Sequence, residues 1–244
     1  MMGYEPNLNM FAGFDIDLHT RFTSGSPSVQ VNIESIHKAL QDGLSFHSKE
    51  NREITVAIRP DHFMTYIRNA YSLHKNARQS STLTLLRKAS SLAPLGDDNL
   101  ASLSVERRRL VQTISRVSRN ANFRQQVLNA YAHRCAITRI QLRLVEAAHI
   151  LPVPAPGSVD HVRNGIALSP TYHRAFDSGL IYLGPDYTVR VNPAKESQLK
   201  KLQLTDGLPD FKKTLGKILL PPDRGQWPDV TFIRRANKYR DIPI

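Results

Sequence analysis

The sequence contains one cysteine, no long apolar run and comparatively few acidic residues. A single cysteine, Cys135, excludes an internal disulfide framework and a zinc site built from CxxC pairs. No stretch approaches the roughly 20 apolar residues that a membrane-spanning helix requires. The first residues lack a basic segment followed by an apolar one, so no secretory signal is expected. We therefore expect a globular, cytoplasmic protein without a membrane segment.

Acidic residues are scarce relative to basic ones, and the imbalance is local. The 244 residues include 33 Lys and Arg against 21 Asp and Glu, a formal net charge of +12. Between Val105 and Arg143 there is one glutamate, and there is neither lysine nor aspartate. The same segment contains nine arginines, at positions 107, 108, 109, 116, 119, 124, 134, 139 and 143. Because arginine binds phosphate through paired hydrogen bonds, this cluster favours nucleic acid as a partner over a merely solubilising charge.

Hydrophobic periodicity predicts an α+β fold whose first part, residues 1–79, is a mixed α/β domain. Strands are expected at 29–33 (VQVNI) and 53–59 (EITVAIR), where apolar and polar residues alternate. Helices are expected over 33–43 and 61–75. The residues of the second helix that are expected to face the core are Phe63, Ile67, Tyr71 and Leu73.

The middle of the chain predicts a linker followed by an arginine-rich helical connector. Residues 80–102 are rich in serine and contain Pro, Gly and Asp in their second half, which is typical of a linker. The second domain, 103–244, begins with helices expected over 103–120 and 123–134. Short strands and a proline-rich loop at 152–165 follow.

One short helix in the second domain is clearly delimited, at SPTYHRAFDSG. Ser169 suits the N-cap, Pro170 suits the first helical position and the glycine suits the exit. His173 and Asp177 are four residues apart, so they share one helix face and could bind one metal ion. Taken alone, such a pair on an exposed face is more often simply solvated.

His149 ends a predicted strand, VEAAHI, just before the proline-rich loop. Its neighbours are alanine, isoleucine and leucine, so this residue alone would be interpreted as a buried histidine bonded to the backbone. The order of strand, loop, strand and helix nevertheless forms a ββα arrangement. Such an arrangement could direct His149 towards the metal ion predicted at His173.

Residues 123–180 resemble the HNH nuclease family, one branch of the ββα-metal or His-Me finger nucleases. The matching segments are, in order, FRQQVLNAYAHRCAIT, VEAAHI, DHVRNGIAL and YHRAFDSGLIYL. His149, Asn164 and His173 match the residues of the family name. Their separations of 15 and 9 residues are similar to those in compact members such as the colicin DNases. The resemblance implies a C-terminal ββα-metal nuclease domain with its core motif at 123–183.

The resemblance also implies roles for individual residues, with His149, Asn164 and His173 as the catalytic set. His149 is implied to be the general base that takes a proton from water, and Asn164 to brace the loop that orients it. His173 and Asp177 are implied ligands of one divalent metal ion at the scissile phosphate. We expect Mg²⁺ or Mn²⁺, with Zn²⁺ or Ni²⁺ as alternatives, because mixed nitrogen and oxygen ligands do not select one metal.

One position departs from the family pattern. Many members carry an Asp or His ligand immediately before the general base, where this chain has Ala148. Glu146 points to the same side as Ala148 if the strand is regular, and is one substitute. Asp160 is another, although a loop-capping role suits it better. Thr138 stands where a CxxC pair would continue from Cys135, so no structural zinc is expected.

The sequence therefore predicts a metal-dependent DNA endonuclease of a restriction system, with dependence on DNA modification as an option. The alternatives are a nonspecific nuclease that acts as a toxin or defence effector, and a DNA-binding protein with an inactive site. Double-stranded DNA is the expected partner, and a homodimer is expected because cutting two strands requires two active sites. Residues 1–79 would then serve recognition or dimerisation. The expected DNA-binding residues are Arg107, Arg108, Arg109, Arg116, Arg119, Arg124 and Arg174.

Overall fold

The computed structural model describes residues 1–20 and 29–242 of the chain. The chain divides into two compact units, Met1–Asn122 and Phe123–Ile244. Helices and short antiparallel strands occur in both, which confirms the predicted α+β class. No helix in the described part of the chain combines the length and the hydropathy that crossing a membrane requires.

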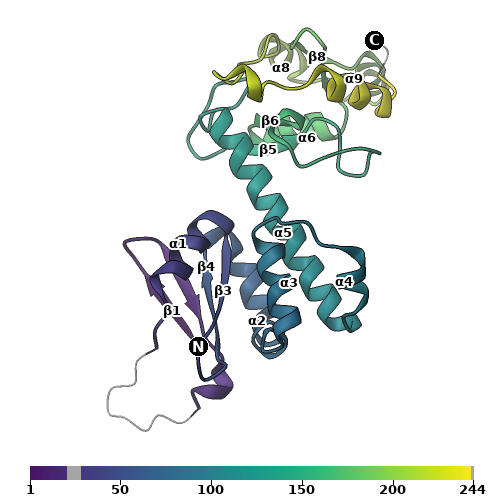
Figure 1. The fold of residues 1–244 in the computed structure, drawn as a ribbon. Helices are drawn as coiled ribbons and strands as arrows, with labels where there is room; N and C mark the ends of the chain where they lie inside the picture. Colours follow the sequence, from purple (N-terminus) through teal and green to yellow (C-terminus); the bar gives the residue numbers. More distant parts are fainter. Residues whose placement is uncertain (21–28, 243–244) are drawn as a thin grey trace. The chain divides into compact units, whose positions relative to one another are not determined.

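Unit 1 is built on a four-stranded antiparallel sheet with the strand order β1-β2-β4-β3. The strands are β1 (Met2–Glu5), β2 (Met10–Gly13), β3 (Leu44–Ser48) and β4 (Ile54–Ile58). Helix α1 (Ile33–Asp42) packs on one face of the sheet, and α2 (Phe63–Ala77) and α3 (Ser80–Ser90) cover the other (Figure 1). Because helices cover both faces, every residue of β4 is buried.

Local sequence signals explain where α1 begins and ends. The Asn32 side chain accepts a hydrogen bond from the Ser35 amide and caps the helix. Gly43 ends it with a positive φ of 88°, a conformation that favours glycine. The helix predicted over 33–43 and the strand predicted over 53–59 thus correspond to α1 and β4. The strand predicted at 29–33 does not form, because that segment leads directly into the cap of α1.

The buried face of α2 differs from the prediction. Among the four residues that were expected to face the core, only Leu73 is buried, whereas Tyr71 is 66% exposed. The helix instead buries Tyr66, Leu73, His74, Asn76 and Ala77. Tyr66 and His74 can lie inside because their polar atoms are paired. The Tyr66 hydroxyl contacts His74 Nε2 at 2.8 Å, and His74 Nδ1 contacts the Ile54 carbonyl oxygen at 2.8 Å.

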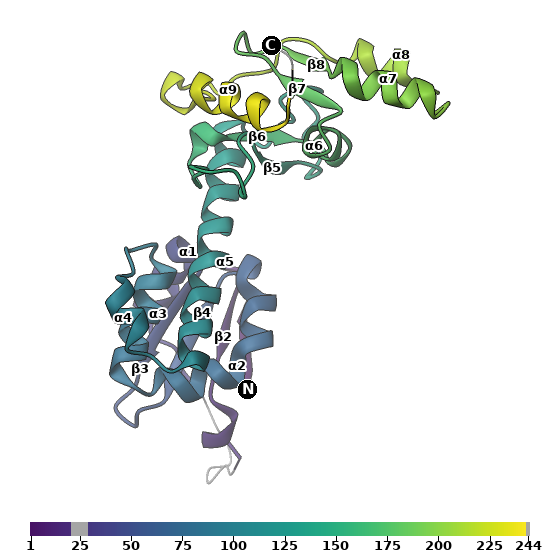
Figure 2. The same ribbon diagram turned by 90° about the vertical axis from the view of Figure 1, so that its right-hand side faces the viewer.

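The segment predicted as a linker, 80–102, is largely helical. It forms α3 and α4 (Asp97–Ala101), and Leu83, Leu85 and Leu86 of α3 are buried in the unit 1 core. A single helix, α5 (Val105–Ala130), then replaces the two helices that were predicted, and Figure 2 shows it beside α2 and α3. Leucine spacing, rather than serine content, determines the structure of this segment.

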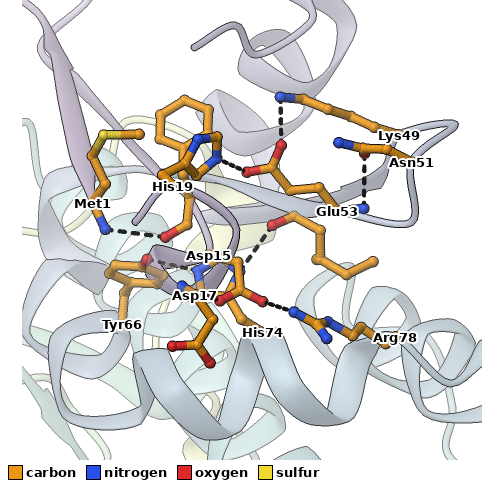
Figure 3. Close-up of polar contacts among 12 residues, drawn as sticks. Met1, Asp15, Asp17, His19, Lys49, Asn51, Glu53, Tyr66, His74 and Arg78 are labelled. Carbon is orange, nitrogen blue, oxygen red and sulfur yellow. Dashed lines mark hydrogen bonds and ion pairs between the residues drawn. The ribbon is translucent and has the colours of Figure 1, made fainter. Parts of the chain in front are cut away.

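A polar network at one end of the sheet holds unit 1 together (Figure 3). Glu53 is 1% exposed, accepts a hydrogen bond from Lys49 Nζ at 2.9 Å and contacts His19 Nε2 at 2.6 Å. Asp15 is also buried and pairs with Arg78, the residue that follows α2. Burial alone would raise the pKa of Glu53, but the hydrogen bonds from Lys49 and His19 outweigh it and hold this pKa below its ordinary value.

This network predicts a pH-dependent effect of Glu53→Gln. A depressed folded-state pKa contributes stability that is present above the unfolded value of 4.5 and is lost as the pH falls through the folded value. At neutral pH we expect the substitution to lower the free energy of unfolding by about 1–2 kcal/mol. The difference from wild type should shrink below the unfolded pKa, as measured by urea unfolding at neutral pH and at about pH 3.

Glu50→Gln is the matched control, because Glu50 lies close by in sequence and is exposed. It should leave the free energy of unfolding unchanged at both pH values. If Glu53→Gln lowered the free energy of unfolding by the same amount at neutral and acidic pH, the contribution of Glu53 would come from its shape and not from its charge.

Unit 2 contains two antiparallel strand pairs and four helices beyond the end of α5 within its described residues. The pairs are β5 (Glu146–His149) with β6 (Gly165–Leu168), and β7 (Ile181–Leu183) with β8 (Val189–Val191). The helices are α6 (Pro170–Asp177), α7 (Pro193–Lys201), α8 (Leu208–Lys213) and α9 (Val230–Tyr239). Helices α7 and α8 lie side by side, where Lys212 and Glu196 form an ion pair of 2.7 Å (Figure 2).

Short 3₁₀ helices complete the described chain, and one of them shapes the site region. They are η1 (Ile16–Leu18), η2 (Pro60–His62), η3 (Val162–Asn164) and η4 (Arg224–Gln226). The core of unit 2 combines Phe123 and Val127 from the end of α5 with Ile166 of β6 and Phe176 of α6. Thus η3, β6 and α6 follow one another directly and rest on a single hydrophobic core.

Candidate active site

A ββα unit carries the predicted catalytic and metal-binding residues. His149 is the last residue of β5, Asn164 immediately precedes β6, and His173 and Asp177 lie on α6. In the antiparallel register, His149 is opposite Gly165. Figure 1 shows β5, β6 and α6 next to one another. Four residues that are spread over 29 positions of the sequence, 149 to 177, are therefore placed on β5, on α6 and on the residue that leads into β6.

The limits of α6 follow from its sequence, with one exception. Pro170 occupies the first turn as predicted, and Gly179 follows the helix with a φ of 71°. The predicted side-chain cap is wrong, because Ser169 makes no capping hydrogen bond. The extended backbone of Ser169, with φ −69° and ψ 156°, still starts the helix at Pro170.

Asn164 is completely buried and ties together the loop between β5 and β6. Its Oδ1 accepts a hydrogen bond from the Leu151 amide at 2.8 Å. Its Nδ2 donates to the Leu151 carbonyl at 3.2 Å, to Ser158 Oγ at 3.3 Å and to the Val159 carbonyl at 3.0 Å. Both halves of the amide are thus used, and the loop that leaves His149 is held at two separate points.

The imidazole of His149 is held at its face and at one edge. Its side chain is 17% exposed, and its ring stacks on Phe123 with centroids 3.8 Å apart and an interplanar angle of 12°. Its Nε2 lies 2.9 Å from Oδ1 of Asp160. The ring is therefore not the fully buried, backbone-bonded histidine that its apolar neighbours alone would indicate.

Gly165 lacks room for a side chain, which explains how Phe123 comes so close to this strand. Its backbone is extended, with φ −120°, so conformational freedom is not the reason for glycine here. A Cβ at this position would lie 2.2 Å from Val127 Cγ2 and 3.2 Å from Phe123 Cε2. The end of α5 can therefore pack directly on β6, opposite His149.

His173 lies between two carboxylates that contact opposite ring nitrogens. Nδ1 is 2.7 Å from Oε2 of Glu146, and Nε2 is 3.3 Å from Oδ2 of Asp177. Two ligands that each lie about 2.1 Å from an ion, at an angle of roughly 90–110°, are about 3.0–3.4 Å apart. The Nε2–Asp177 spacing fits shared binding of one ion, whereas the Nδ1–Glu146 spacing is that of a hydrogen bond.

Ala148 stands at the position where many family members have a metal ligand, and here this position belongs to the hydrophobic core. Ala148 is completely buried, while Glu146, two residues earlier on β5, is exposed and reaches His173. Over residues 1–20 and 29–242, no three His, Cys, Asp or Glu side chains are arranged around one metal site. Asp160 faces His149 rather than His173, so the structure does not bring it into a ligand set.

Comparison with known proteins addresses the same segment. Residues 135–184 match the family model described as HNH endonuclease. This segment is an HNH endonuclease domain. The predicted HNH family is therefore confirmed for this segment. HNH nucleases generally use one divalent metal ion, and DNA binding is typical of the family.

The N-terminal part of the chain has a second match. Residues 1–67 match the family model described as methylase-associated X1. A search of curated proteins gives no match. Among solved structures, the modification-dependent TagI restriction endonuclease is similar to this chain at 15% identity and a TM-score of 0.36, with 82% of this chain and 52% of that chain covered. The chain therefore spans about half the length of that protein.

The predicted DNA-binding arginines are divided between the two units. Arg124 of α5 and Arg174 of α6 lie in the same unit as the HNH domain, and both are exposed. The other five lie on the part of α5 that belongs to unit 1: Arg107, Arg108, Arg109, Arg116 and Arg119. Arg109, Arg116 and Arg119 are exposed, and Arg107 is half-buried.

Arg108 makes hydrogen bonds within unit 1. Its guanidinium donates to the carbonyl oxygens of Leu100 at 2.9 Å, Ala101 at 3.0 Å and Leu103 at 3.4 Å. These bonds satisfy backbone groups at the end of α4 and in the turn that precedes α5. Two of the three guanidinium nitrogens, Nε and one Nη, are thus engaged within unit 1.

Two neighbours of the HNH site were not identified from the sequence. Asp160 was considered only as a loop cap or a ligand, yet it contacts His149. Arg240, which follows α9, donates to the Ile150 carbonyl at 2.9 Å and lies over the Phe176 ring at 4.7 Å. Burial lowers the pKa of Arg240, while the Asp177 carboxylate acts in the opposite direction. Arg240 lies outside the family motif, so no local spacing could have indicated it.

Proposed function

We propose that the protein is a metal-dependent endonuclease that hydrolyses phosphodiester bonds of double-stranded DNA. The observation that carries this proposal is the HNH match at 135–184, which includes both histidines and the asparagine of the family name. An inactive, purely DNA-binding protein is disfavoured because each of those residues has kept its chemical type and a defined set of contacts. The departure at Ala148 concerns one ligand only.

His149 is the proposed general base. Its ring is held by Phe123 and remains partly exposed, so it can meet water next to a bound phosphate. Asn164 transfers no proton in this proposal, because all of its polar atoms are engaged in the interior of the loop. It fixes the backbone that leaves His149, and so acts on the reaction only through the placement of the base.

His173 and Asp177 are the proposed metal ligands, and their donors have a suitable separation. His173 Nε2 and an Asp177 oxygen would bind the ion, while Nδ1–H donates to Glu146. A carboxylate that fixes the second nitrogen is frequent at metal-binding histidines. When bound, the ion would neutralise charge on the scissile phosphate. Oxygen and nitrogen ligation favours Mg²⁺ or Mn²⁺ first, and Zn²⁺ or Ni²⁺ as alternatives.

Exposed arginines of α5 are the proposed phosphate contacts in unit 1. Replacing Arg109, Arg116 and Arg119 with glutamine should weaken DNA binding. It should also flatten the slope of log K against log salt by about 3, because each lost phosphate contact removes roughly 0.9. Fluorescence anisotropy over a salt series measures this slope. Arg108→Gln is the matched control on the same helix and should keep the wild-type slope, because that guanidinium bonds backbone carbonyls.

An unchanged slope in the triple variant would move the phosphate contacts away from this face of α5. Arg124 and Arg174, which are exposed in unit 2, would then be the remaining predicted contacts. A flattened slope in Arg108→Gln would show that its bonds to the carbonyls do not persist when DNA is present.

A restriction-type role is the proposed biological setting. The match of residues 1–67 to a methylase-associated family supports a link to DNA modification, and this part of the chain would recognise DNA or dimerise. Two active sites are needed to cut both strands, so we propose a homodimer. Whether cleavage requires modified or unmodified DNA then depends on unit 1 and not on the HNH domain.

Digestion of methylated and unmethylated supercoiled plasmids, each with Mg²⁺, Mn²⁺, Zn²⁺ and Ni²⁺, tests the proposal. We expect nicking or linearisation that a chelator abolishes, and discrete fragments from one of the two plasmids. A smear from both plasmids would favour a nonspecific toxin or effector nuclease. Protein that retards DNA but cuts neither plasmid with any of the four metals would refute the enzymatic activity.

A further inference from the structure

Asp160 is the polar partner of His149, and its position follows from the loop that Asn164 holds. The Val159 carbonyl, directly before Asp160, accepts a hydrogen bond from Asn164 Nδ2 at 3.0 Å. The Asp160 side chain is 28% exposed and places Oδ1 2.9 Å from His149 Nε2. The amide that braces the loop therefore also places this carboxylate at the edge of the imidazole.

This contact determines which nitrogen of a neutral His149 carries the proton. An ionised carboxylate can only accept hydrogen bonds, so Nε2 must be the protonated nitrogen. Nδ1 is then left with a free lone pair. The stacked Phe123 ring, 12° from parallel, fixes the plane in which that lone pair points. Tautomer and ring plane are thus set by two side chains that approach from different directions.

We propose that Asp160 is a positioning residue that holds His149 as the Nε2–H tautomer, so that Nδ1 is the atom that accepts the proton from the attacking water. This inference rests on the proposed function, in which His149 is the general base. It differs from the two roles that the sequence left open for Asp160, a metal ligand and a loop cap, because neither accounts for the contact with the imidazole.

The proton and electron changes of the step are balanced by these groups together with solvent. An O–H bond of water breaks, its proton binds Nδ1, and the water oxygen forms a bond to phosphorus as the bond from phosphorus to the leaving oxygen breaks. His149 becomes an imidazolium with both nitrogens protonated. Asp160 stays ionised and stabilises that charge through Nε2–H, without receiving a proton itself. The leaving oxygen keeps the electron pair of the broken bond and takes a proton from solvent, and solvent in turn takes the extra proton from Nδ1.

The Asp160→Asn variant distinguishes positioning from a structural hydrogen bond. Asparagine has the same shape and offers both a donor and an acceptor, so it keeps a structural contact but no longer selects one tautomer. We expect kcat for plasmid cleavage to fall about 10²-fold in both Asp160→Asn and Asp160→Ala, with partial recovery in Asp160→Glu. Asp186→Asn is the control, because Asp186 is exposed in the same unit and pairs with Arg190.

The tautomer itself can be read from ¹⁵N spectra of the imidazole, with His149→Gln to assign the signal. Wild type should show protonated Nε2, and Asp160→Asn should show a mixture of tautomers. Mn²⁺ affinity, measured by calorimetry without DNA, should be unchanged in Asp160→Ala and reduced in His173→Ala. These spectra and titrations report on Asp160 independently of cleavage rates.

Three results would overturn the inference: protonated Nδ1 in wild type, wild-type kcat in Asp160→Asn, or a loss of Mn²⁺ affinity in Asp160→Ala equal to that in His173→Ala. The wild-type spectrum needs no variant, so an unstable variant does not prevent the test. If His149→Gln cleaves at the wild-type rate, the proposed base fails even though the tautomer is as expected. If His149→Gln is inactive while Asp160→Asn is fully active, the proposed base stands and the positioning role fails.

Discussion

His149→Ala should lower the rate of plasmid cleavage by about 10³-fold or more while DNA binding and metal binding stay near wild type. The substitution removes the proposed proton acceptor and leaves His173 and Asp177, 3.3 Å apart on α6, untouched. The ring is 17% exposed and bonds only at its edge, so its loss should not unfold the domain. Single-turnover cleavage, DNA anisotropy and Mn²⁺ calorimetry measure the three quantities.

His133→Ala provides a matched control for this experiment. His133 lies in the same unit, is exposed and contacts Asn129 at 3.2 Å, away from the ββα unit. It should cleave at the wild-type rate. Wild-type cleavage by His149→Ala would remove this residue from the mechanism, and equal losses of cleavage and Mn²⁺ affinity would identify it as a ligand instead of a base.

Asn164→Asp should be the most damaging conservative substitution in unit 2. The aspartate keeps the acceptor for the Leu151 amide but loses the donor that serves the Leu151 and Val159 carbonyls. It also places a carboxylate in a completely buried position facing those carbonyl oxygens. We expect a loss of about 3 kcal/mol in the free energy of unfolding, because burying a carboxylate against carbonyl oxygens and leaving the Val159 carbonyl without its donor both destabilise the fold.

Calorimetry should detect this loss of stability as a fall of about 10 °C in the unfolding temperature of unit 2, given the usual entropy of unfolding for a domain of this size. Cleavage measured well below that transition should still be reduced at least 10-fold, because the loop that carries Asp160 is released. Asn120→Asp, at an exposed position of α5, should change neither the unfolding temperature nor the cleavage rate. Normal stability in Asn164→Asp would mean that the carboxyl group is protonated in the fold and still donates.

Where local chemistry determined the structure, the sequence was enough to predict it. Helix α1 with its asparagine cap, the β-branched strand β4, and α6 between Pro170 and Gly179 all follow from short-range signals. The site residues could be identified because their order and spacing match a family pattern, and the family model covers the same segment. Their individual roles remain predictions until the substitutions are tested.

Where tertiary pairing determined the structure, the sequence was misleading. The buried face of α2 includes Tyr66 and His74, which are acceptable inside only because they hydrogen bond to each other. Helix α3 contains several serines and threonines, but Leu83, Leu85 and Leu86 place it in the core. The strands β1 and β2 contain no Val, Ile or Thr, and they form because β1 pairs with β2 and β2 pairs with β4. None of these partners is visible within a short window of sequence.

In the site, too, contacts between residues far apart in the sequence could not be predicted. The contact between Asp160 and His149 spans 11 positions across an irregular loop, and that between Arg240 and Ile150 spans 90. Neither has a periodic signal, because a loop has no fixed repeat and α9 reaches the site only through the packing of the whole unit. The stacking of Phe123 on His149 was likewise hidden, since a phenylalanine on an apolar helix face predicts no more than burial.

The absence of a side chain at Gly165 has a consequence for the evolution of this domain. The space beside its Cα is filled by Val127, whose Cγ2 would be 2.2 Å from any Cβ, so the two positions share one fixed volume. Relatives with alanine at position 165 should therefore carry a smaller residue than valine at position 127, and the two columns should covary. The glycine after Asn164 would then be retained for the space it leaves to the facing helix, and not for the turn that an Asn-Gly pair usually indicates.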